Sequence, residues 1–596
     1  MRFDAVPVKA EWLDANVPCT QACPVLTNAG RYVTAIAEGD FDLAYLIARM
    51  PNPFPSICGR VCAAPCESAC RRGYFDEPIA IRALKRFACE QAGVESGRAE
   101  RVWRQALETM PRRDERVAIV GAGPAGLACA HDLACFGYRP IVFDAADRAG
   151  GMMVLGIPPY RLRREILQAE VRAILGLGVE IRLDRRLGVD FSVSSLFDDG
   201  FSSVFLATGA MRSRDLQIPG AELDGTLKAV DFLINANSGY RVDLGERVVV
   251  VGGGNVALDV ARTALRDQAP TETAAFDVAR VAVRMGARDV TVVALEARDE
   301  MPAHEFEIEE AEIEGIKIRH RLGPLRVLGS QTVEGLETLD VSSVFDPDGR
   351  FNPRFVEGTE RTIACDSLIL AIGQAPDLSW LEPGDGIQTS QRGTIAVDAR
   401  SLATTAPNVF AGGDVAFGPR NLIDAIGDGR RAAASIHAAL AGDEWPTPHP
   451  ERRMLPLHVL RRPVLEYDAV PRVAIPSVPS ERRIGVPEVE LGYSTEQARL
   501  EASRCLQCFM NIELDSDSCI LCGGCVDVCP EKVIRIVPVE QVAGLEADRP
   551  ASALILQEDF CIRCGLCIER CPTHALSFGA WPERSTGFRQ VEMVGA

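Results

Sequence analysis

The chain has 596 residues, of which 47% are hydrophobic and 25% charged, so it is neither a mostly disordered chain, a collagen nor a coiled coil. Its length predicts about four domains. We find no apolar run of the ~18 residues that a membrane span needs and no secretory signal, so we expect a cytoplasmic protein. The net charge of −19 disfavours nucleic acid as a partner.

The 20 cysteines are concentrated between positions 19 and 89 and between positions 505 and 571. Only Cys129, Cys135 and Cys365 lie outside these two regions. A disulfide-rich protein is normally short and secreted, whereas cysteines two and three residues apart in an intracellular chain indicate metal binding. The cysteine pattern therefore predicts metal centres at both ends of the chain.

In chain order, residues 1–110 contain the first cysteine region and helical patterns, and a polar break follows. Residues 116–445 alternate Val/Ile-rich runs, glycine-rich turns and Ala-rich segments, which is typical of α/β folds. Residues 446–504 are rich in proline and charge and are expected to be a linker. The segment CILCGGCVDVCP at 519 recurs as CIRCGLCIERCP at 561, which is an internal repeat.

Each of these repeats has four cysteines in the spacing CxxCxxCxxxCP, which is that of two-cluster bacterial ferredoxins. Zinc sites use CxxC pairs instead. In the ferredoxin pattern the fourth cysteine of each run ligates the other cluster. The predicted ligands are Cys519, Cys522, Cys525 and Cys571 for one [4Fe–4S] cluster, and Cys561, Cys564, Cys567 and Cys529 for the other.

The N-terminal cysteines begin with a CxxxCP motif, and a distant RCxxC pair lies at 504–508. This arrangement resembles the N-terminal iron–sulfur domain of the glutamate synthase small subunit and of dihydropyrimidine dehydrogenase. The resemblance implies that the chain returns and that the distant pair completes the N-terminal domain. It implies one cluster held by Cys505, Cys508, Cys19 and Cys70, and a second held in part by Cys23, Cys62 and Cys66.

The fourth ligand of this second cluster departs from the family pattern. Some relatives use Gln or Glu at the position of Lys85, and a protonated lysine has no lone pair to offer iron. We expect Cys58 to replace it, with Cys89 as the alternative. With Cys58, sixteen cysteines serve four clusters and four remain as buried thiols. Zinc or free thiols are the alternative interpretation of the N-terminal set.

A first glycine-rich motif, GAGPAG, follows the apolar run VAIV, and such a turn admits a pyrophosphate at a helix N-terminus. Asp144 ends the next apolar run, where a ribose-binding acid is expected, although a solvated acid is the alternative. The segments APNVFAGGD, LATG and GGMMVLGIPPYRL resemble FAD-binding segments of flavoproteins with two dinucleotide folds, the last one in its glutamate synthase form. The FAD candidates are Gly121, Gly123, Pro124, Ala125, Gly126, Asp144, Gly151, Thr208, Gly209, Gly413 and Asp414.

The second motif, GGGNVALD, follows VVVV and resembles the pyridine-nucleotide site that is inserted into the FAD domain. NADPH-dependent relatives end the next strand with Tyr-Arg-Arg, where this chain has Ala294-Leu295-Glu296. A carboxylate accepts hydrogen bonds from a 2′-OH and repels a 2′-phosphate, which predicts NAD(H), while the nearby Arg298 keeps NADP(H) open. The candidates are Gly252, Gly254, Asn255, Val256, Ala257 and Glu296. Residues 267–285 resemble an insertion, and the acidic run at 305–314 is expected to be a solvated helix face.

The expected fold is α/β, with two Rossmann-like dinucleotide-binding domains, one inserted in the other, an N-terminal α-helical Fe–S domain and a C-terminal α+β bacterial-type ferredoxin domain. The expected boundaries are 1–110, completed by 500–510, for the helical domain. They are 116–222 and 361–445 for the FAD domain, 223–360 for the NAD domain, 446–504 for the linker and 511–580 for the ferredoxin domain.

A nicotinamide carries two electrons as hydride, a cluster carries one, and a flavin converts between them. We therefore expect an NAD(H)-dependent electron-transfer subunit with FAD and four [4Fe–4S] clusters, in which no amino-acid side chain is catalytic. It would exchange electrons with ferredoxin or a partner redox subunit in a hetero-oligomer, for example a 2-oxoacid:ferredoxin oxidoreductase or an aromatic acyl-CoA reductase system. The alternatives are a free-standing NAD(P)H:ferredoxin oxidoreductase, a glutamate synthase small subunit and a scaffold with structural clusters.

Overall fold

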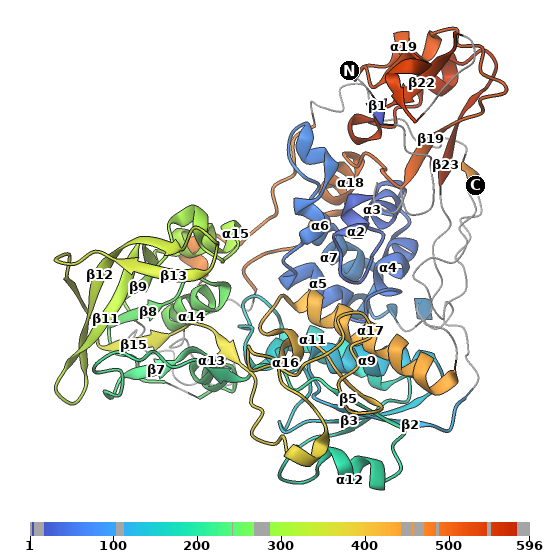
Figure 1. Cartoon of the computed structure of the whole chain (residues 1–596). Helices are drawn as coiled ribbons and strands as arrows, with labels where there is room; N and C mark the ends of the chain where they lie inside the picture. The colour runs from blue at the N-terminus through green and yellow to red at the C-terminus, as the bar shows by residue number, and fades with distance from the viewer. Residues whose placement is uncertain are drawn as a thin grey trace.

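The computed structural model describes residues 3–4, 17–99, 101–102, 112–240, 242–266, 287–442, 455–457, 470–483, 488–544 and 550–580. The N-terminal helices lie in the middle of the molecule, between a C-terminal domain at one end and the first dinucleotide-binding domain at the other (Figure 1). The second dinucleotide-binding domain projects to the side (Figure 1). This arrangement confirms the predicted fold class.

The first dinucleotide-binding domain is built on a five-stranded, fully parallel sheet. Its inner strands are Val/Ile/Phe-rich and buried on both faces, as expected of a parallel sheet covered by helices. The strands are, in spatial order, β17 (Val409–Ala411), β5 (Ser203–Leu206), β2 (Arg116–Val120), β3 (Arg139–Phe143) and β4 (Glu180–Arg182). The main helices are α9 (Pro124–Cys135), α10 (Met152–Leu155), α11 (Arg164–Leu175), α12 (Val193–Asp198), α16 (Asp414–Phe417) and α17 (Leu422–Ala441).

The second dinucleotide-binding domain repeats this plan with a second parallel five-stranded sheet. Its strands are β10 (Lys317–Arg319), β9 (Asp289–Val293), β8 (Arg247–Val251), β15 (Ser367–Leu370) and β7 (Thr226–Lys228). Its helices are α13 (Ala229–Asn237), α14 (Asn255–Arg266) and α15 (Glu305–Ile313). An antiparallel layer adds β11 (Leu322–Gly329), β12 (Val333–Phe345), β13 (Phe351–Phe355) and β14 (Arg361–Ala364).

The boundary expected at residue 360 is wrong. Strands β14 and β15 lie beyond it, yet β14 pairs with β12 and β15 pairs with β8 and β7. The chain leaves this domain only after β15, through β16 (Gln374–Ala375), which pairs with β6 (Arg212–Ser213) from the entering segment. The two connections thus form one ribbon, which a linear sequence pattern does not reveal. The insertion expected at 267–285 lies outside the described residues.

The N-terminal domain consists of short helices around a core that includes Tyr32, Ile36 and Phe87. A helix from the far end of the chain, α18 (Thr495–Ser503), packs on α3 and contributes Ala498 and Ala502 to that core. The range expected to be a linker therefore contains a helix of this domain. The helices are α2 (Pro18–Gln21), α3 (Ala29–Glu38), α4 (Phe41–Arg49), α5 (Pro55–Val61), α6 (Pro65–Ser68) and α7 (Ile81–Ala92). Among the described helices, none has the length and apolar character needed to cross a membrane.

The C-terminal domain has two short helices and two small antiparallel sheets, as expected of a ferredoxin-type α+β fold. Its helices α19 (Gly524–Val528) and α20 (Leu566–Arg570) each follow the glycine in a CxxCGxC segment. The strands are β19 (Met510–Leu514) and β18 (Leu455–Leu457), both paired with β23 (Leu576–Ala580), and β20 (Ile534–Pro538) paired with β22 (Ser552–Leu556). Strand β1 (Phe3–Asp4) pairs with β21 (Val542–Ala543), which ties the N-terminus to this domain.

Candidate functional site

The first glycine motif forms the turn between β2 and α9. A Cβ atom at Gly121 would lie 2.2 Å from the carbonyl oxygen of Ala207, and one at Gly126 would lie 1.9 Å from the carbonyl oxygen of Gly121. Gly121 also has a φ of 114°, which disfavours other residues. Pro124 and Ala125 start α9 directly after this turn, so the helix N-terminus faces the space above it. The turn has the geometry that a pyrophosphate requires.

Two aspartates lie beside this turn. Asp144 follows β3 and accepts hydrogen bonds from the backbone N–H groups of Ala122, at 2.6 Å, and Ala146, at 2.8 Å. Burial raises the pKa of Asp144. Asp414 starts α16 after Gly413, and burial, helped by the neighbouring Asp428, raises its pKa to about 6. Buried carboxylates with unused lone pairs are suited to accept hydrogen bonds from the hydroxyl groups of a ribose or ribityl chain.

The space between these segments fits a bound dinucleotide. The Oγ1 atom of Thr208 is buried and has no hydrogen-bond partner within the described chain. Gly151 has a φ of 53° and approaches Gly123 so closely that a Cβ on it would lie 2.8 Å from the Cα atom of Gly123. Gly209, next to Thr208, has no atom near its Cβ position. An orphaned hydroxyl and glycine-lined open space are what a flavin nucleotide site leaves in the protein.

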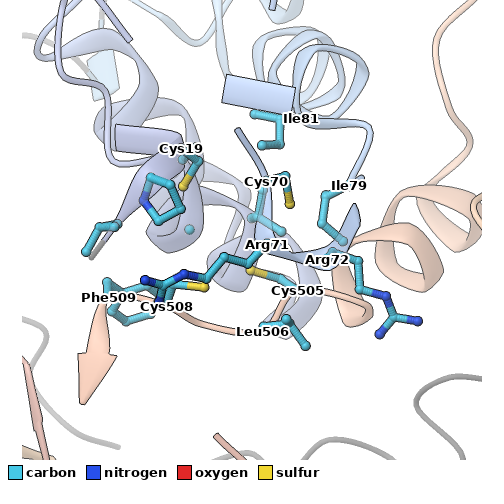
Figure 2. Close-up of a pocket in the computed structure, with 15 residues that line it drawn as sticks. Cys19, Cys70, Arg71, Arg72, Ile79, Ile81, Cys505, Leu506, Cys508 and Phe509 are labelled. Carbon is cyan, nitrogen blue, oxygen red and sulfur yellow. The ribbon is translucent and has the colours of Figure 1, made fainter. Parts of the chain in front are cut away.

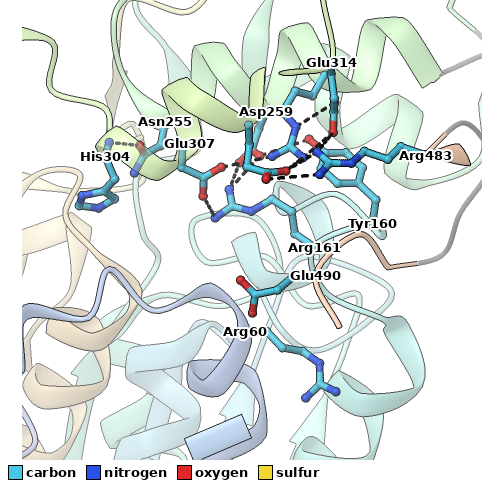
Figure 3. Close-up of polar contacts among 12 residues, drawn as sticks. Arg60, Tyr160, Arg161, Asn255, Asp259, His304, Glu307, Glu314, Arg483 and Glu490 are labelled. Carbon is cyan, nitrogen blue, oxygen red and sulfur yellow. Dashed lines mark hydrogen bonds and ion pairs between the residues drawn. The ribbon is translucent and has the colours of Figure 1, made fainter. Parts of the chain in front are cut away.

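The second glycine motif forms the corresponding turn between β8 and α14. A Cβ at Gly252 would lie 2.4 Å from the carbonyl oxygen of Ala371, while Gly254 has open space beside it. Val256 and Ala257 follow in the first turn of α14. The Asn255 side chain accepts a hydrogen bond from the backbone N–H of His304 at 2.9 Å, so it holds the start of α15 against the motif (Figure 3).

Glu296 lies at the carboxyl end of β9, directly beside this turn. Its Oε2 atom would be 2.6 Å from a Cβ placed on Gly253, so the glycine leaves room for the carboxylate. Glu296 is half-buried, and burial, helped by the neighbouring Glu300, raises its pKa. The nearby Arg298 does not neutralise it, because its guanidinium forms ion pairs with Glu305 at 2.8 Å and Glu312 at 2.7 Å.

A buried ion-pair network joins the two dinucleotide-binding domains (Figure 3). Arg161 pairs with Asp259 of α14 at 2.7 Å and with Glu307 of α15, whose side chain is only 2% exposed. Glu314 is 4% exposed and pairs with Arg262 at 2.7 Å. Only part of the acidic run at 305–314 is therefore a solvated helix face: Glu305, Glu309 and Glu312 are exposed, whereas Glu307, Glu310 and Glu314 enter the ion-pair network. The prediction was wrong for these three residues because their partners come from elsewhere in the chain, including Arg483 in the range expected to be a linker.

The first N-terminal cysteine set comes together from segments far apart in the sequence. Cys19 and Cys70 of the helical domain and Cys505 and Cys508 after α18 line one pocket (Figure 2). Glu501 holds α18 in place, because its fully buried carboxylate accepts hydrogen bonds from the backbone N–H groups of Ala80 and Val473 and pairs with Arg504. Four thiols around one pocket are the donor set that a [4Fe–4S] cluster requires.

The second N-terminal set lies where α5 packs on α7. Cys23, Cys58 and Cys62 belong to one apolar core. Burial lowers the pKa of Lys85, but the thiols of Cys23, Cys58, Cys62 and Cys66 together raise it above its ordinary value. The neighbouring thiol of Cys62, together with burial, raises the pKa of Cys58. Cys89, the other candidate, lies instead in a separate apolar cluster with Tyr45 and Ala92. The arrangement favours Cys58 as the fourth thiol of this set.

The two C-terminal sets are formed by crossing between the repeats. One pocket is lined by cysteines of the first repeat and by the last cysteine of the second, and the other pocket has the reverse composition. The first set is Cys519, Cys522, Cys525 and Cys571, and the second is Cys561, Cys564, Cys567 and Cys529. These are the groupings expected from the spacing of the motifs.

The N-terminal cysteine region contacts the first dinucleotide-binding domain on one side and the C-terminal domain on the other. Cys23, Cys58 and Cys62 belong to the same apolar core as the first dinucleotide-binding domain. Gly427 of α17 makes this contact close, since a Cβ there would lie 2.9 Å from the carbonyl oxygen of Pro24. At the other end, the buried Arg563 donates hydrogen bonds to the carbonyl oxygens of Met510 and Cys561.

Sequence reasoning missed the charged residues that hold these parts together. Glu170 of α11 accepts hydrogen bonds from the backbone N–H groups of Ser56 and Ile57, and so binds the first turn of α5 to the first dinucleotide-binding domain. Glu501 likewise binds α18 to the N-terminal domain, and Arg161 links the two dinucleotide-binding domains. The residues beside the RCxxC pair, Glu501-Ala-Ser-Arg504, contained a signal for one of them, because an acid and a base three residues apart on a helix can pair.

Comparison with known families agrees with this geometry. Residues 115–435 match the pyridine nucleotide-disulphide oxidoreductase family, which is more than half of the chain. Residues 14–96 match the 4Fe–4S domain II of dihydropyrimidine dehydrogenase, and residues 518–575 match the 4Fe–4S dicluster domain. The chain belongs to the pyridine nucleotide-disulphide oxidoreductase family, and it combines an FAD/NAD(P) oxidoreductase domain with 4Fe–4S domains at both ends.

Three relatives extend this comparison over most of the chain. The NADP(+)-dependent formate dehydrogenase subunit beta of Moorella thermoacetica is 38% identical, over 83% of this chain and 71% of the relative. The NADPH-Fe(3+) oxidoreductase subunit beta of Geobacter sulfurreducens is 35% identical, over 83% and 75%. The glutamate synthase [NADPH] small chain of Azospirillum brasilense is 32% identical, over 70% and 86%. The predicted resemblance to the glutamate synthase small subunit is confirmed.

Proposed function

We propose that the protein is the electron-transfer subunit of a larger redox enzyme, and that it exchanges electrons between NAD(H) and a ferredoxin or a partner catalytic subunit. Bound FAD would supply the conversion between hydride and single electrons. The observation that carries the proposal is that one cysteine set shares the core of the first dinucleotide-binding domain (the flavin-type domain) and that three further sets line pockets in the N-terminal helical domain and the C-terminal domain. The relatives' names, which include two beta subunits and a small chain, support a role as a subunit.

The chain's own residues would position the redox groups and insulate them. The glycine turns before α9 and α14 would each hold a pyrophosphate, and the Arg161 network would fix the two domains relative to each other. Arg563 is 1% exposed and donates a hydrogen bond to the carbonyl oxygen of Cys561. The thiols of Cys508 and Cys561 raise its pKa against the effect of burial. It would thus hold the first N-terminal set, which contains Cys508, against the second C-terminal set, which contains Cys561.

Native purification tests this proposal. We expect a second redox subunit to co-elute, about sixteen iron atoms and one FAD per chain, and reduction of both flavin and clusters by NADH. Turnover of a carbon substrate with NAD by the purified chain alone would contradict the proposal. Efficient reduction of ferredoxin by the chain alone, without a co-eluting subunit, would instead favour a free-standing NAD(P)H:ferredoxin oxidoreductase.

The preference for NAD(H) is a separate part of the proposal. Glu296 beside Gly253 supports it, because the carboxylate would accept hydrogen bonds from a ribose 2′-OH and repel a 2′-phosphate. Arg298 forms ion pairs with two glutamates, which would compete with a phosphate for its guanidinium. The names of the relatives favour NADP(H) instead, so this coenzyme is the second candidate.

Steady-state kinetics with both coenzymes distinguishes the two. We expect kcat/KM to be at least ~10-fold higher with NADH, and Glu296→Ala to lose most of this preference by weakening NADH and relieving the repulsion of NADPH. Glu300→Ala, which removes an exposed acid nearby, is the control. A wild-type preference for NADPH that Glu296→Ala leaves unchanged would contradict the proposed role of Glu296.

The assignment of Cys58 to the second N-terminal set has its own test. We expect Cys58→Ser to lower the iron content from about sixteen to about twelve per chain, because one [4Fe–4S] cluster loses a ligand. Cys89→Ser changes a thiol that is equally buried but lies in another cluster, and is expected to retain all the iron. The reverse result would assign the ligand role to Cys89.

A further inference from the structure

Lys85 is a buried lysine for which the described part of the chain provides no carboxylate partner. It lies in the middle of α7 and is 6% exposed. Within the described residues no acidic side chain forms an ion pair with it, and its contact with a ring is to Tyr32, whose centroid lies 5.8 Å from Nζ. Burying an ammonium group costs several kcal/mol unless a charge compensates it. The site therefore requires an anion that the side chains of aspartate and glutamate do not provide.

The groups that do face Lys85 are the thiols of the second N-terminal set. Helix α5 packs so closely on α7 that a Cβ on Gly59 would lie 2.7 Å from the Cα atom of Arg86. This contact brings the segment of Cys58 and Cys62 directly beside Lys85. Helix α6, which carries Cys66, also contacts α7. Cys23 lies in the same apolar core as Cys58 and Cys62, so the set comes together where α5 and α6 pack on the helix of Lys85.

We propose that Lys85 is the counter-cation of the iron–sulfur cluster at Cys23, Cys58, Cys62 and Cys66, and that it holds the reduction potential of that cluster above the value the four thiolates would give alone. The inference rests on the proposed function in requiring a cluster at these thiols. Reduction adds one electron and no proton, so it increases the negative charge beside Lys85. A fixed cation stabilises the more negative state, and in a buried site water screens this interaction weakly.

This role also explains the departure from the family pattern at position 85. A protonated lysine cannot donate a lone pair to iron, so it does not replace the Gln or Glu of the relatives as a ligand. Cys58 supplies the fourth thiolate, which adds a negative charge relative to a Gln ligand. Lys85 offsets that added charge. Because this set packs against the flavin-type domain, its potential determines how readily electrons leave that domain.

The experiment is a potentiometric titration of the holoenzyme followed by EPR, combined with an iron assay. Lys85→Met keeps an unbranched apolar stem against Tyr32 and removes the charge, whereas Lys85→Arg keeps the charge. We expect one cluster midpoint to shift to a more negative potential in Lys85→Met, with iron unchanged at about sixteen per chain. The midpoints should remain near their wild-type values in Lys85→Arg and in the control Lys317→Met, which removes an exposed lysine of the second dinucleotide-binding domain.

The other outcomes are also decisive. Unchanged midpoints in Lys85→Met with full iron would overturn the inference, and so would an equal negative shift or an equal loss of iron in Lys85→Arg. Loss of about four iron atoms in Lys85→Met but not in Lys85→Arg would support it, since the site would then need the charge to assemble. A wild-type protein with only about twelve iron atoms and no cluster at these thiols would instead refute the four-cluster assignment on which the inference rests.

Discussion

The two cysteine-rich regions hold the same number of thiol sets but surround them differently. In the N-terminal region, Cys23 and Cys62 are 6% and 8% exposed, and Cys58 is fully buried. In the C-terminal region, Cys522 is exposed, and its neighbours Ile520 and Leu521 are 64% and 40% exposed. The first region is enclosed by protein next to the flavin-type domain, and the second ends at the surface. This difference suits one region to insulating electrons and the other to passing them to a partner.

The same contrast recurs inside the C-terminal repeat. Ile562 and Arg563 occupy the repeat positions of Ile520 and Leu521, yet they are 4% and 1% exposed. The second repeat is covered because it docks on the N-terminal region, where Arg71 pairs with Asp559 at 2.7 Å. The contact between the repeats and the rest of the chain, and not the cluster motif itself, therefore determines which set faces solvent.

The largest effect is expected where the N-terminal region depends on a distant segment. Glu501→Ala removes the carboxylate that binds Ala80 and Val473 and leaves the buried Arg504 with Asp76, at 3.0 Å, as its remaining ion-pair partner among the described residues. Breaking such a buried pair costs about 3–5 kcal/mol. We expect the set containing Cys505 and Cys508 to lose its cluster, so that the iron content falls by about four atoms per chain, measured by iron assay and EPR.

The control for this prediction is Glu496→Ala, which removes an exposed acid from the first turn of the same helix. It should keep the full iron content and melt within ~0.5 kcal/mol of the wild type. Full iron and an unchanged melting temperature in Glu501→Ala would show that the return of the chain does not depend on this carboxylate.

Exchanging the residues at positions 563 and 521, which correspond in the two C-terminal repeats, tests why one repeat is buried and the other exposed. Arg563→Leu introduces the residue of the first repeat and leaves the carboxylate of Glu558, which Arg563 contacts at 2.9 Å, buried without its partner. We expect a cost of about 3 kcal/mol and slower reduction of the C-terminal clusters by coenzyme, measured by freeze-quench EPR.

The reciprocal variant, Leu521→Arg, adds a charge at an exposed position and should change stability by less than ~0.5 kcal/mol. Equal changes in the stability of Arg563→Leu and Leu521→Arg would show that the different exposure of these two positions does not affect the stability of the protein.

The sequence predicts the cysteine groupings of the C-terminal region better than those of the N-terminal region. The C-terminal ligand groupings could be derived because their spacing and crossing are local properties of a repeated motif. The grouping of Cys19 with Cys505 came only through a family resemblance, because no local pattern brings residues so distant in sequence together. The sequence also leaves Cys58 and Cys89 as alternatives, and the packing supports the proposal of Cys58 by placing it in the same core as Cys23 and Cys62.

The ion pairs between domains could not be predicted from the sequence. Glu307 and Glu314 read as a solvated acidic face because a linear pattern shows no partner for them, yet Arg161 and Arg262 bury both. The boundary at residue 360 failed for a related reason, since β15 joins its sheet between β8 and β7, strands that precede it by more than a hundred residues. Long-range pairing of this kind is a property of the assembled fold.

The smallest effect is expected at Glu170, which links the buried N-terminal region to the flavin-type domain. Burial raises the pKa of Glu170 to about 7, above the value of about 4.3 for an unfolded chain. Between these values the folded protein binds the proton and the unfolded chain does not, so its stability falls as the pH rises through this window. This contribution is fully present below about pH 4.3 and is lost as the pH approaches about 7.

Glu170→Gln removes this titration while keeping an acceptor for Ser56. Relative to the variant, the wild type should lose about 2 kcal/mol of stability between pH 5.5 and pH 8, measured from thermal unfolding at several pH values. Glu165→Gln, on an exposed face of the same helix, should show the wild-type profile. A pH dependence that Glu170→Gln leaves unchanged would mean that the burial of Glu170 is not its source.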